Sequence, residues 1–448
     1  MTTPQVTSAA HRSTSRAARL GERVRQLRVA AGLTQSELAG ERFSKEYVSQ
    51  IERGKTRPTQ ETISWLAARL GVDAAFLANG ISSDERTRIE SALSRAETLT
   101  EAREFDDAIA EFERVRIPVE ATGLPHLVVR ARLGEGWAHF RKGDARRALA
   151  IFTEARVVAE RDVFSDIERA EVLFALGACR WKLSSISTAV ALLDEALKLA
   201  ERSNAPSDSL RSRILYWRSR CRQRQRDWEA AREDVDRALE LAEGLDDRKG
   251  LAHLYLQASL IAERDGHWVL ARSHAERARA IFEALADRLH VGVLLNNLGG
   301  LQFLLGKPDE AVEYLKSSFA VALEVGEDVE AGRAVSSLAQ VHLRTGRPEL
   351  AEEQAQQALR LLEGRIDHLD EVGNAQLVLG RSLLEQRRLD DAERVLDEAE
   401  LTLEQLESVS HVAAAWIAKG DLAQARGDDV RASKLYRRAA EALQDFRF

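Results

Sequence analysis

The residues best suited to chemistry lie between positions 35 and 57, where polar side chains recur at the spacing of one exposed helix face and its ends. Lys45 can donate to guanine O6 or N7, Gln50 can pair with adenine, and Glu46 can accept a hydrogen bond from cytosine N4. Amide and cationic side chains on either side suit phosphate contacts. The predicted contacts to double-stranded DNA are Gln35, Ser44, Lys45, Glu46, Ser49, Gln50, Arg53, Lys55 and Arg57.

Short helices must position these side chains. Thr34 and Glu37 stand three residues apart, as in a capping box, and predict a helix that begins there. Ser44 is the next N-cap, and the helix that it opens turns Val48 and Ile51 inward, which leaves the polar residues facing outward. Two short helices joined by a tight turn fit a helix-turn-helix, whose second helix can lie in the major groove of DNA.

Five such helices are predicted over residues 20–80, and this region resembles the Cro/C1-type (xenobiotic-response-element, XRE) helix-turn-helix family. The resemblance rests on the strings LGERVRQLR, GLTQ, ELA, YVSQIERGK and RPT and extends to about residue 72. It implies a buried ion pair between Arg28 and Glu52, and dimeric, sequence-specific DNA binding. The alternative is a five-helix bundle that binds no DNA.

Charge divides the chain into two parts. The 448 residues include 65 Lys or Arg and 72 Asp or Glu, for a net charge of −7. Residues 1–80 hold 12 basic and 7 acidic side chains, whereas the remainder holds 53 and 65. A basic head on an acidic body suggests two separate roles and excludes a uniformly basic coat for nucleic acid.

Composition narrows the class of protein further. Strand signals are almost absent and Ala, Leu, Glu and Arg dominate, which predicts an all-α fold. Two cysteines exclude a disulfide-stapled scaffold, and no catalytic motif, metal site or cofactor is expected. No apolar run reaches about 18 residues, so no membrane partner is expected and a cytoplasmic location is predicted. Residues 1–19 predict a disordered basic arm, with a transit peptide as the alternative.

From residue 81 onwards an internal repeat dominates the sequence. Alanines recur at intervals of 40 to 42 residues, at Ala108, Ala148, Ala189, Ala231, Ala271, Ala311, Ala351, Ala392 and Ala432. Five of them follow a turn glycine by five residues. A small residue stands 12 positions before each alanine, and another stands seven positions after it, except at Val115. Small residues in register let two helices pack closely, so each unit is predicted as helix A, a short turn and helix B.

This repeat resembles the tetratricopeptide repeat (TPR), although its period of about 40 exceeds the usual 34 and overlaps that of HEAT and armadillo arrays. The resemblance covers residues 88–448 and implies a right-handed superhelix whose groove is lined by helix A. The predicted architecture is therefore a five-helix helix-turn-helix domain, residues 20–80, followed by an α-solenoid of about nine TPR-like helical hairpins, residues 81–448.

Positions 18, 15 and 11 residues before each alanine should face the groove. The side chains selected there for ligand contact are Arg130, Trp137, Arg213, Tyr216, Arg220, Asn296, Arg333, Gln340, Asn374 and Arg381. Arginines suit carboxylates and asparagine amides suit an extended backbone, which predicts a peptide or protein ligand with acidic groups or a free C-terminus. The alternative, of equal weight, is that these arginines pair with neighbouring glutamates.

Together the two parts resemble the peptide-pheromone-responsive bacterial regulators known as the RRNPP group. The resemblance implies a transcriptional regulator, not an enzyme, in which occupancy of the groove controls dimeric DNA-binding heads. A homodimer is also expected from Phe446 and Phe448, which end the last repeat without a polar cap. The alternative function is an interaction scaffold that docks a protein partner, with the helix-turn-helix in a secondary role.

Overall fold

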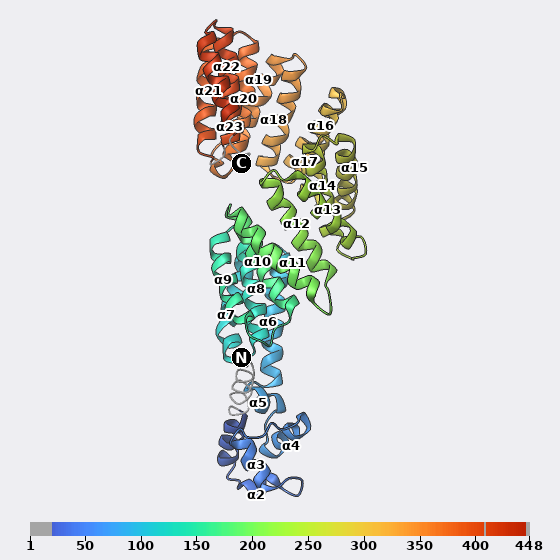
Figure 1. Ribbon diagram of the computed structural model, residues 1–448, viewed down its shortest axis with the longest axis vertical. Helices are drawn as coiled ribbons and strands as arrows, with labels where there is room; N and C mark the ends of the chain where they lie inside the picture. The colour runs from blue at the N-terminus through green and yellow to red at the C-terminus, as the bar shows by residue number, and fades with distance from the viewer. Residues whose placement is uncertain (1–19, 407–408, 445–448) are drawn as a thin grey trace, which may run out of the picture. The chain divides into compact units, whose positions relative to one another are not determined.

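The computed structural model describes residues 20–406 and 409–444 (Figure 1). Within those ranges every regular element is a helix and no strand occurs, so the predicted all-α class is confirmed. No helix in the same ranges is long and apolar enough to cross a membrane. The predicted basic arm, residues 1–19, and the terminal Phe446 and Phe448 lie outside the described residues.

Five short helices make up the N-terminal part, as predicted. They are residues 20–30, α2 (Gln35–Ala39), α3 (Lys45–Glu52), α4 (Gln60–Leu70) and α5 (Ala74–Asn79). The capping box of α2 is present, because the Glu37 N–H donates to Thr34 Oγ1 at 3.1 Å and the Thr34 N–H donates to Glu37 Oε2 at 2.6 Å. Ser44 caps α3 by accepting a hydrogen bond from the Tyr47 N–H.

The apolar faces of these helices meet in one core. Its fully buried side chains include Val24, Leu38, Val48 and Leu77. The first helix packs tightly on the end of α3, since a Cβ at Gly21 would lie 2.6 Å from the backbone oxygen of Glu52. Only glycine permits that approach, and it fixes the position of α3 in the domain.

Nine helical hairpins follow in the described part of the chain, in agreement with the repeat. Their helices A and B are α6 (Ser83–Glu101) and α7 (Phe105–Ala121), α8 (Pro125–Lys142) and α9 (Ala145–Ala159), α10 (Asp166–Lys182) and α11 (Ile186–Arg202), α12 (Asp208–Arg224) and α13 (Trp228–Ala242), α14 (Arg248–Arg264) and α15 (Trp268–Ala284), α16 (Arg288–Leu304) and α17 (Pro308–Glu324), α18 (Asp328–Arg344) and α19 (Pro348–Leu361), α20 (Leu369–Glu385) and α21 (Leu389–Glu404), and α22 (Val409–Ala425) and α23 (Asp429–Gln444). A short 3-10 helix, η1 (Ile366–His368), precedes α20. The helices of the hairpins are 14 to 19 residues long, which accounts for the long repeat period.

The repeating small residues are the contact points within each hairpin. All nine repeat alanines are at most 4% exposed. Where the position 12 residues earlier is glycine, the side chain four residues after the alanine occupies the space of the missing Cβ. At Gly177, for example, an added Cβ would lie 2.8 Å from Leu193 Cγ. The same relation joins Gly136 to Phe152, Gly299 to Leu315, Gly380 to Leu396 and Gly420 to Tyr436. The small-residue columns therefore set how closely helix A meets helix B.

The turn inside every hairpin uses a left-handed backbone residue five positions before the repeat alanine. Five of these positions are glycine, for example Gly346 with a φ of 75°. The other four hold residues with a side chain, at Arg103, Ser184, Arg226 and Arg387, with φ between 59° and 66°. The four repeats that lack the glycine therefore keep the same turn at a conformational cost.

The chain divides into two compact units, one ending at Ser207 and the other beginning at Asp208. The division falls inside the repeat array, between α11 and α12, where the sequence carries no linker signal. The first unit contains the N-terminal helices and three hairpins, and the second contains six hairpins.

Candidate DNA-binding helix and ligand groove

The helix α3 presents one polar face and buries the other. Val48 and Ile51 are 0% and 1% exposed in the domain core, as predicted. Lys45, Glu46 and Gln50 are exposed on the opposite side. Because positions three and four apart share a helix face, Glu46 and Gln50 lie next to each other along the exposed surface.

A buried ion pair holds the C-terminal end of α3. Arg28 Nε donates to Glu52 Oε1 at 2.6 Å, and Arg28 Nη2 donates to Glu52 Oε2 at 3.2 Å. Gln35 Nε2 donates to Glu52 Oε2 at 2.7 Å and joins α2 to the same carboxylate. Burial raises the pKa of Glu52, but the hydrogen bonds from Arg28 and Gln35 outweigh it and leave this pKa below its ordinary value. The ion pair that the family resemblance implied is thus confirmed.

The predicted DNA contacts fall into two groups. Seven are exposed, and Gln35 and Ser49 are half-buried. Three already make a local hydrogen bond: Ser44 as the cap of α3, Gln35 to Glu52, and Gln50, whose Oε1 accepts from the Thr56 hydroxyl at 2.9 Å. The four cations have no ion-pair partner among the described residues; they are Lys45, Arg53, Lys55 and Arg57. Unpaired cations at both ends of an exposed helix can neutralise phosphates without first breaking an internal contact.

Two adjoining cavities lie along helices A of the second unit. The first, of about 280 Å³, is lined by four of the predicted groove residues, namely Arg333, Gln340, Asn374 and Arg381. The second, of about 390 Å³, is lined by Asn296 and again by Gln340. The two cavities share Ser337, Gln340 and Arg344 and are therefore continuous. Sequence spacing brought these five predicted residues together but missed Arg344, which lies seven residues before the repeat alanine rather than eleven.

The polar groups of this groove differ in how far they are satisfied. Arg333 is paired, with its Nε 2.7 Å from Glu371 Oε1 and its Nη1 2.9 Å from Glu330 Oε2. Arg381 has no ion pair among the described residues, and its buried Nε has no hydrogen-bond partner. The Oδ1 atom of Asn296 is also buried without a partner. A buried polar atom without a hydrogen bond is costly, which marks a position where a ligand group can bind.

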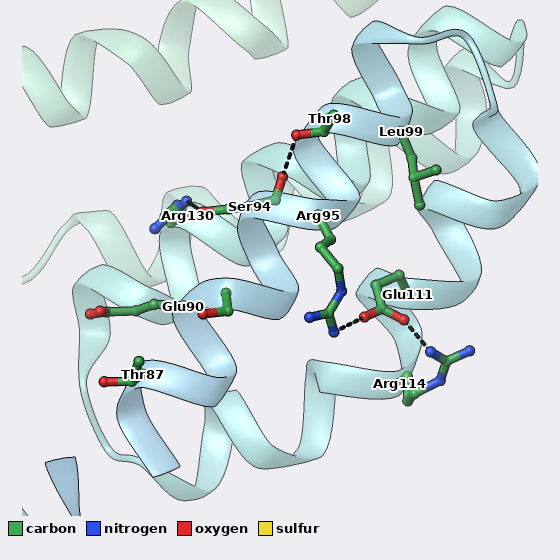
Figure 2. A pocket seen from close by; sticks show the side chains of 10 residues that line it. Thr87, Glu90, Ser94, Arg95, Thr98, Leu99, Glu111, Arg114 and Arg130 are labelled. Carbon is green, nitrogen blue, oxygen red and sulfur yellow. Dashed lines mark hydrogen bonds and ion pairs between the residues drawn. The ribbon is translucent and has the colours of Figure 1, made fainter. Parts of the chain in front are cut away.

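The remaining predicted groove residues lie elsewhere and have internal contacts. In the first unit, Arg130 lines a cavity of about 830 Å³ between α6, α7 and α8 (Figure 2). Its Nη2 donates to Glu97 Oε2 at 2.7 Å and to Ser94 Oγ at 3.0 Å. Figure 2 also shows Glu111 between two arginines, so the cations of this cavity are already compensated.

The aromatic groove candidates are in contact with other rings or with an arginine. Trp137 packs against Phe140, Phe152 and Phe174 with centroids 5.3 to 5.6 Å apart. On α12, Arg220 lies over the ring of Tyr216 at 5.7 Å. Neither residue lines the two cavities of the second unit, and the same holds for Arg213 on the exposed side of α12.

Comparison with known proteins agrees with this division. Residues 19–79 match a family model described as a helix-turn-helix domain. Models described as tetratricopeptide repeat match residues 290–364 and residues 133–209, 336–403 and 377–445. The HTH-type transcriptional regulator DdrOP3 of Deinococcus deserti is 39% identical over 64 residues, which are 14% of this chain and 50% of that protein. The chain thus spans about half the length of the curated relative that it matches.

Solved structures are similar in fold over most of the chain. The apo form of the quorum sensor NprR from B. thuringiensis superposes with a TM-score of 0.61 at 12% identity, over 80% of this chain and 99% of that one. The Rap conjugation gene regulator of the plasmid pLS20, in complex with the Phr* peptide, has a TM-score of 0.51 at 12% identity, over 80% and 96%. At such identities the likeness establishes the fold alone. The chain is therefore an XRE-type helix-turn-helix domain joined to a C-terminal tetratricopeptide-repeat solenoid.

Proposed function

We propose that this protein is a sequence-specific DNA-binding transcriptional regulator, whose solenoid binds a peptide or protein segment and thereby controls the DNA-binding heads. The observation that carries the proposal is helix α3, which exposes Lys45, Glu46 and Gln50 while its apolar face is locked in the core. A rigid helix with base-reading side chains on its open face is what major-groove recognition requires. The cations beyond it, Arg53, Lys55 and Arg57 on the exposed surface, supply the phosphate contacts.

The groove of the second unit supports the ligand part of the proposal. Asn296 has a buried carbonyl oxygen that can accept an N–H from an extended backbone, and Asn374 offers an exposed amide on the next wall. Cavities of this size, with apolar walls and a few polar groups, are typical of ligand sites. A structure of similar fold was solved with a peptide bound, and another is named a quorum sensor.

Dimerisation and location belong to the same proposal. Helix-turn-helix proteins bind two half-sites about one helical turn apart as dimers, so a palindromic or directly repeated operator is expected. The site of action is then the cytoplasm, where bacterial DNA is accessible.

The DNA part is tested by incubating the purified full-length protein with sheared host DNA and sequencing the retained fragments. We expect enrichment of one paired motif by the wild-type chain and its loss in Lys45→Ala/Gln50→Ala. The exposed, unpaired Arg146 on α9 provides a control, and Arg146→Ala should retain the same fragments. If the double variant keeps its fold and retains the same motif, the proposed recognition helix is wrong.

The ligand part needs its own measurement. The peptide fraction of spent host culture medium is added to the same DNA-retention assay, and a change in retained DNA is expected. In Asn296→Ala/Asn374→Ala that change should disappear, while DNA retention without the peptide fraction stays at the wild-type level. A response that persists in this variant would place the ligand outside the groove.

One observation favours a second candidate, an interaction scaffold that docks a protein partner. Three consecutive apolar residues at the start of α15 are solvent-exposed: Trp268 by 39%, Val269 by 65% and Leu270 by 46%. Contiguous exposed apolar surface is typical of protein contacts. Absence of any enriched DNA motif with or without the peptide fraction, together with one stoichiometric protein partner, would favour this function.

A further inference from the structure

The two continuous cavities of the second unit contain more positive charge than they compensate. Four arginines line them: Arg264, Arg333, Arg344 and Arg381. Only two carboxylates do so, Glu263 and Glu371. The body that surrounds this groove is acidic overall, so a cationic lining is a local feature and not a consequence of composition.

The carboxylates neutralise only part of this lining. Glu371 accepts a hydrogen bond from Arg333, which is also paired with Glu330 outside the cavity. Glu263 and Arg264 are sequence neighbours, and the attraction between their charges lowers the pKa of Glu263 against the raising effect of burial. Arg344 and Arg381 remain, and neither has an ion-pair partner among the residues that the structure describes.

The uncompensated guanidinium groups are held in place by their surroundings. Arg344 lies over the ring of Phe303 with its Cζ 5.8 Å from the centroid, at the outer limit of a cation–π contact. Arg381 has a buried Nε, so its stem is packed while the side chain as a whole stays half-buried. Both arginines line the same 280 Å³ cavity. A planar guanidinium that is already ordered loses less entropy when it binds a carboxylate.

Apolar side chains flank the two arginines on both sides. Leu343, Leu377 and Val378 line the first cavity, and Phe303, Leu304 and Leu315 line the second. Leu377 and Val378 are 7% and 5% exposed, so their contribution is a firm wall. The groove therefore alternates an apolar region, a cationic region around Arg344 and Arg381, and a second apolar region with the unsatisfied Asn296.

We propose that this groove selects an extended peptide segment that carries a carboxylate between or beside apolar side chains, and that Arg344 and Arg381 bind that carboxylate. The inference rests on the proposed function only in that the ligand is a peptide segment in this groove. The carboxylate can belong to an Asp or Glu side chain or to a free C-terminus, because the two present the same group to a guanidinium.

The test uses the full-length protein and three synthetic heptapeptide pools with mixed apolar residues. The first pool has one Glu and an amidated C-terminus, the second has Gln in its place and a free C-terminus, and the third has Gln and an amidated C-terminus. Peptides retained by the immobilised protein are quantified by mass spectrometry. We expect the first or the second pool to be retained at least about tenfold above the third, because hydrogen bonds to charged groups are worth about 1.5–3 kcal/mol. Which of the two is retained identifies the source of the carboxylate.

Three variants complete the test. Arg344→Gln and Arg381→Gln should each lower retention of the preferred pool by about tenfold and leave DNA retention without peptide unchanged. Arg347→Gln is the matched control, because Arg347 is exposed three residues beyond Arg344, has no ion pair among the described residues and lines neither cavity. Thermal unfolding of each variant checks that the fold survives.

The outcomes separate this inference from the proposed function. Equal retention of the neutral third pool would overturn the carboxylate selection while leaving a peptide groove intact. Retention of no pool, or retention that is unchanged in both arginine variants, would also overturn it. Enrichment of a DNA motif is measured independently, so the regulator proposal does not depend on these results.

Discussion

The guanidinium of Arg28 reaches across the N-terminal domain to the carboxylate of Glu52, with Nε and Oε1 2.6 Å apart. Glu52 is the last residue of α3, and its side chain is only 4% exposed. The same carboxylate accepts a hydrogen bond from Gln35 in α2. One buried acid therefore connects the first helix, α2 and the recognition helix, and the orientation of α3 depends on it.

Removal of the cation should destabilise this domain strongly. Arg28→Met leaves Glu52 buried without its partner, which costs about 3–5 kcal/mol in comparable pairs. Hydrogen exchange measured by mass spectrometry should then show loss of protection in α2 and α3. The exposed Arg88, on α6 and without an ion pair among the described residues, provides the control. Arg88→Met should change protection by less than about 0.5 kcal/mol.

The pH dependence of the domain should follow from Glu52. Its pKa is lowered in the folded state from an ordinary value of 4.5, so the ionised form stabilises the fold. That contribution is fully present above about pH 4.5 and is lost as the pH falls through the lower folded pKa. Thermal unfolding between pH 3 and 7 should show a smaller loss on acidification in Glu52→Gln than in the wild-type chain. Identical pH profiles would contradict this role.

Phosphate and base contacts should separate in binding measurements. Lys55→Ala should weaken binding to all DNA sequences alike and reduce the slope of log affinity against log salt by about 1. Gln50→Ala should instead relax discrimination at one base pair, by about 1–3 kcal/mol. Fluorescence anisotropy with the enriched motif and single-base variants, at several salt concentrations, distinguishes the two effects. A Lys55 variant with an unchanged salt slope would rule out its phosphate contact.

The left-handed turn residues predict a stabilising substitution. Arg387 holds a φ of 60°, is exposed and makes no side-chain hydrogen bond or ion pair with the described residues. Arg387→Gly relieves about 1–2 kcal/mol of strain and costs about 0.5–1 kcal/mol of chain entropy, so a net gain of about 0.5–1 kcal/mol is expected in denaturant unfolding. The converse substitution, Gly346→Ala at a φ of 75°, should destabilise by about 1 kcal/mol.

Two helical glycines should respond in opposite directions to alanine. Gly177→Ala forces a Cβ to within 2.8 Å of the buried Leu193, so overpacking should exceed the gain in helix propensity and cost about 1–2 kcal/mol. A Cβ at Gly300 would meet no atom within 4 Å among the described residues, so Gly300→Ala should gain about 1 kcal/mol. Chemical denaturation of both variants tests the packing account, and equal effects would refute it.

Local signals in the sequence predicted most of the fold, because they act over short distances along the chain. Caps such as Thr34 and Ser44 bind backbone groups three residues away, so their pattern identifies where a helix begins. The repeat alanines act between two helices of one hairpin, within about 20 residues, and nine recurrences make the period unmistakable. The same locality explains why all five N-terminal helices and all nine hairpins of the described chain could be predicted.

Partners from different repeats could not be assigned in this way. Arg130 and Arg333 hold the same kind of groove position as Arg381, but Glu97 and Glu371 come from the adjacent repeats and neutralise the first two. The residues by themselves determined that the chain is a DNA-binding type of helical domain followed by a regular solenoid. Only the tertiary structure decided which cations stay uncompensated and that the array divides at Ser207, since both depend on how side chains from separate repeats meet in space.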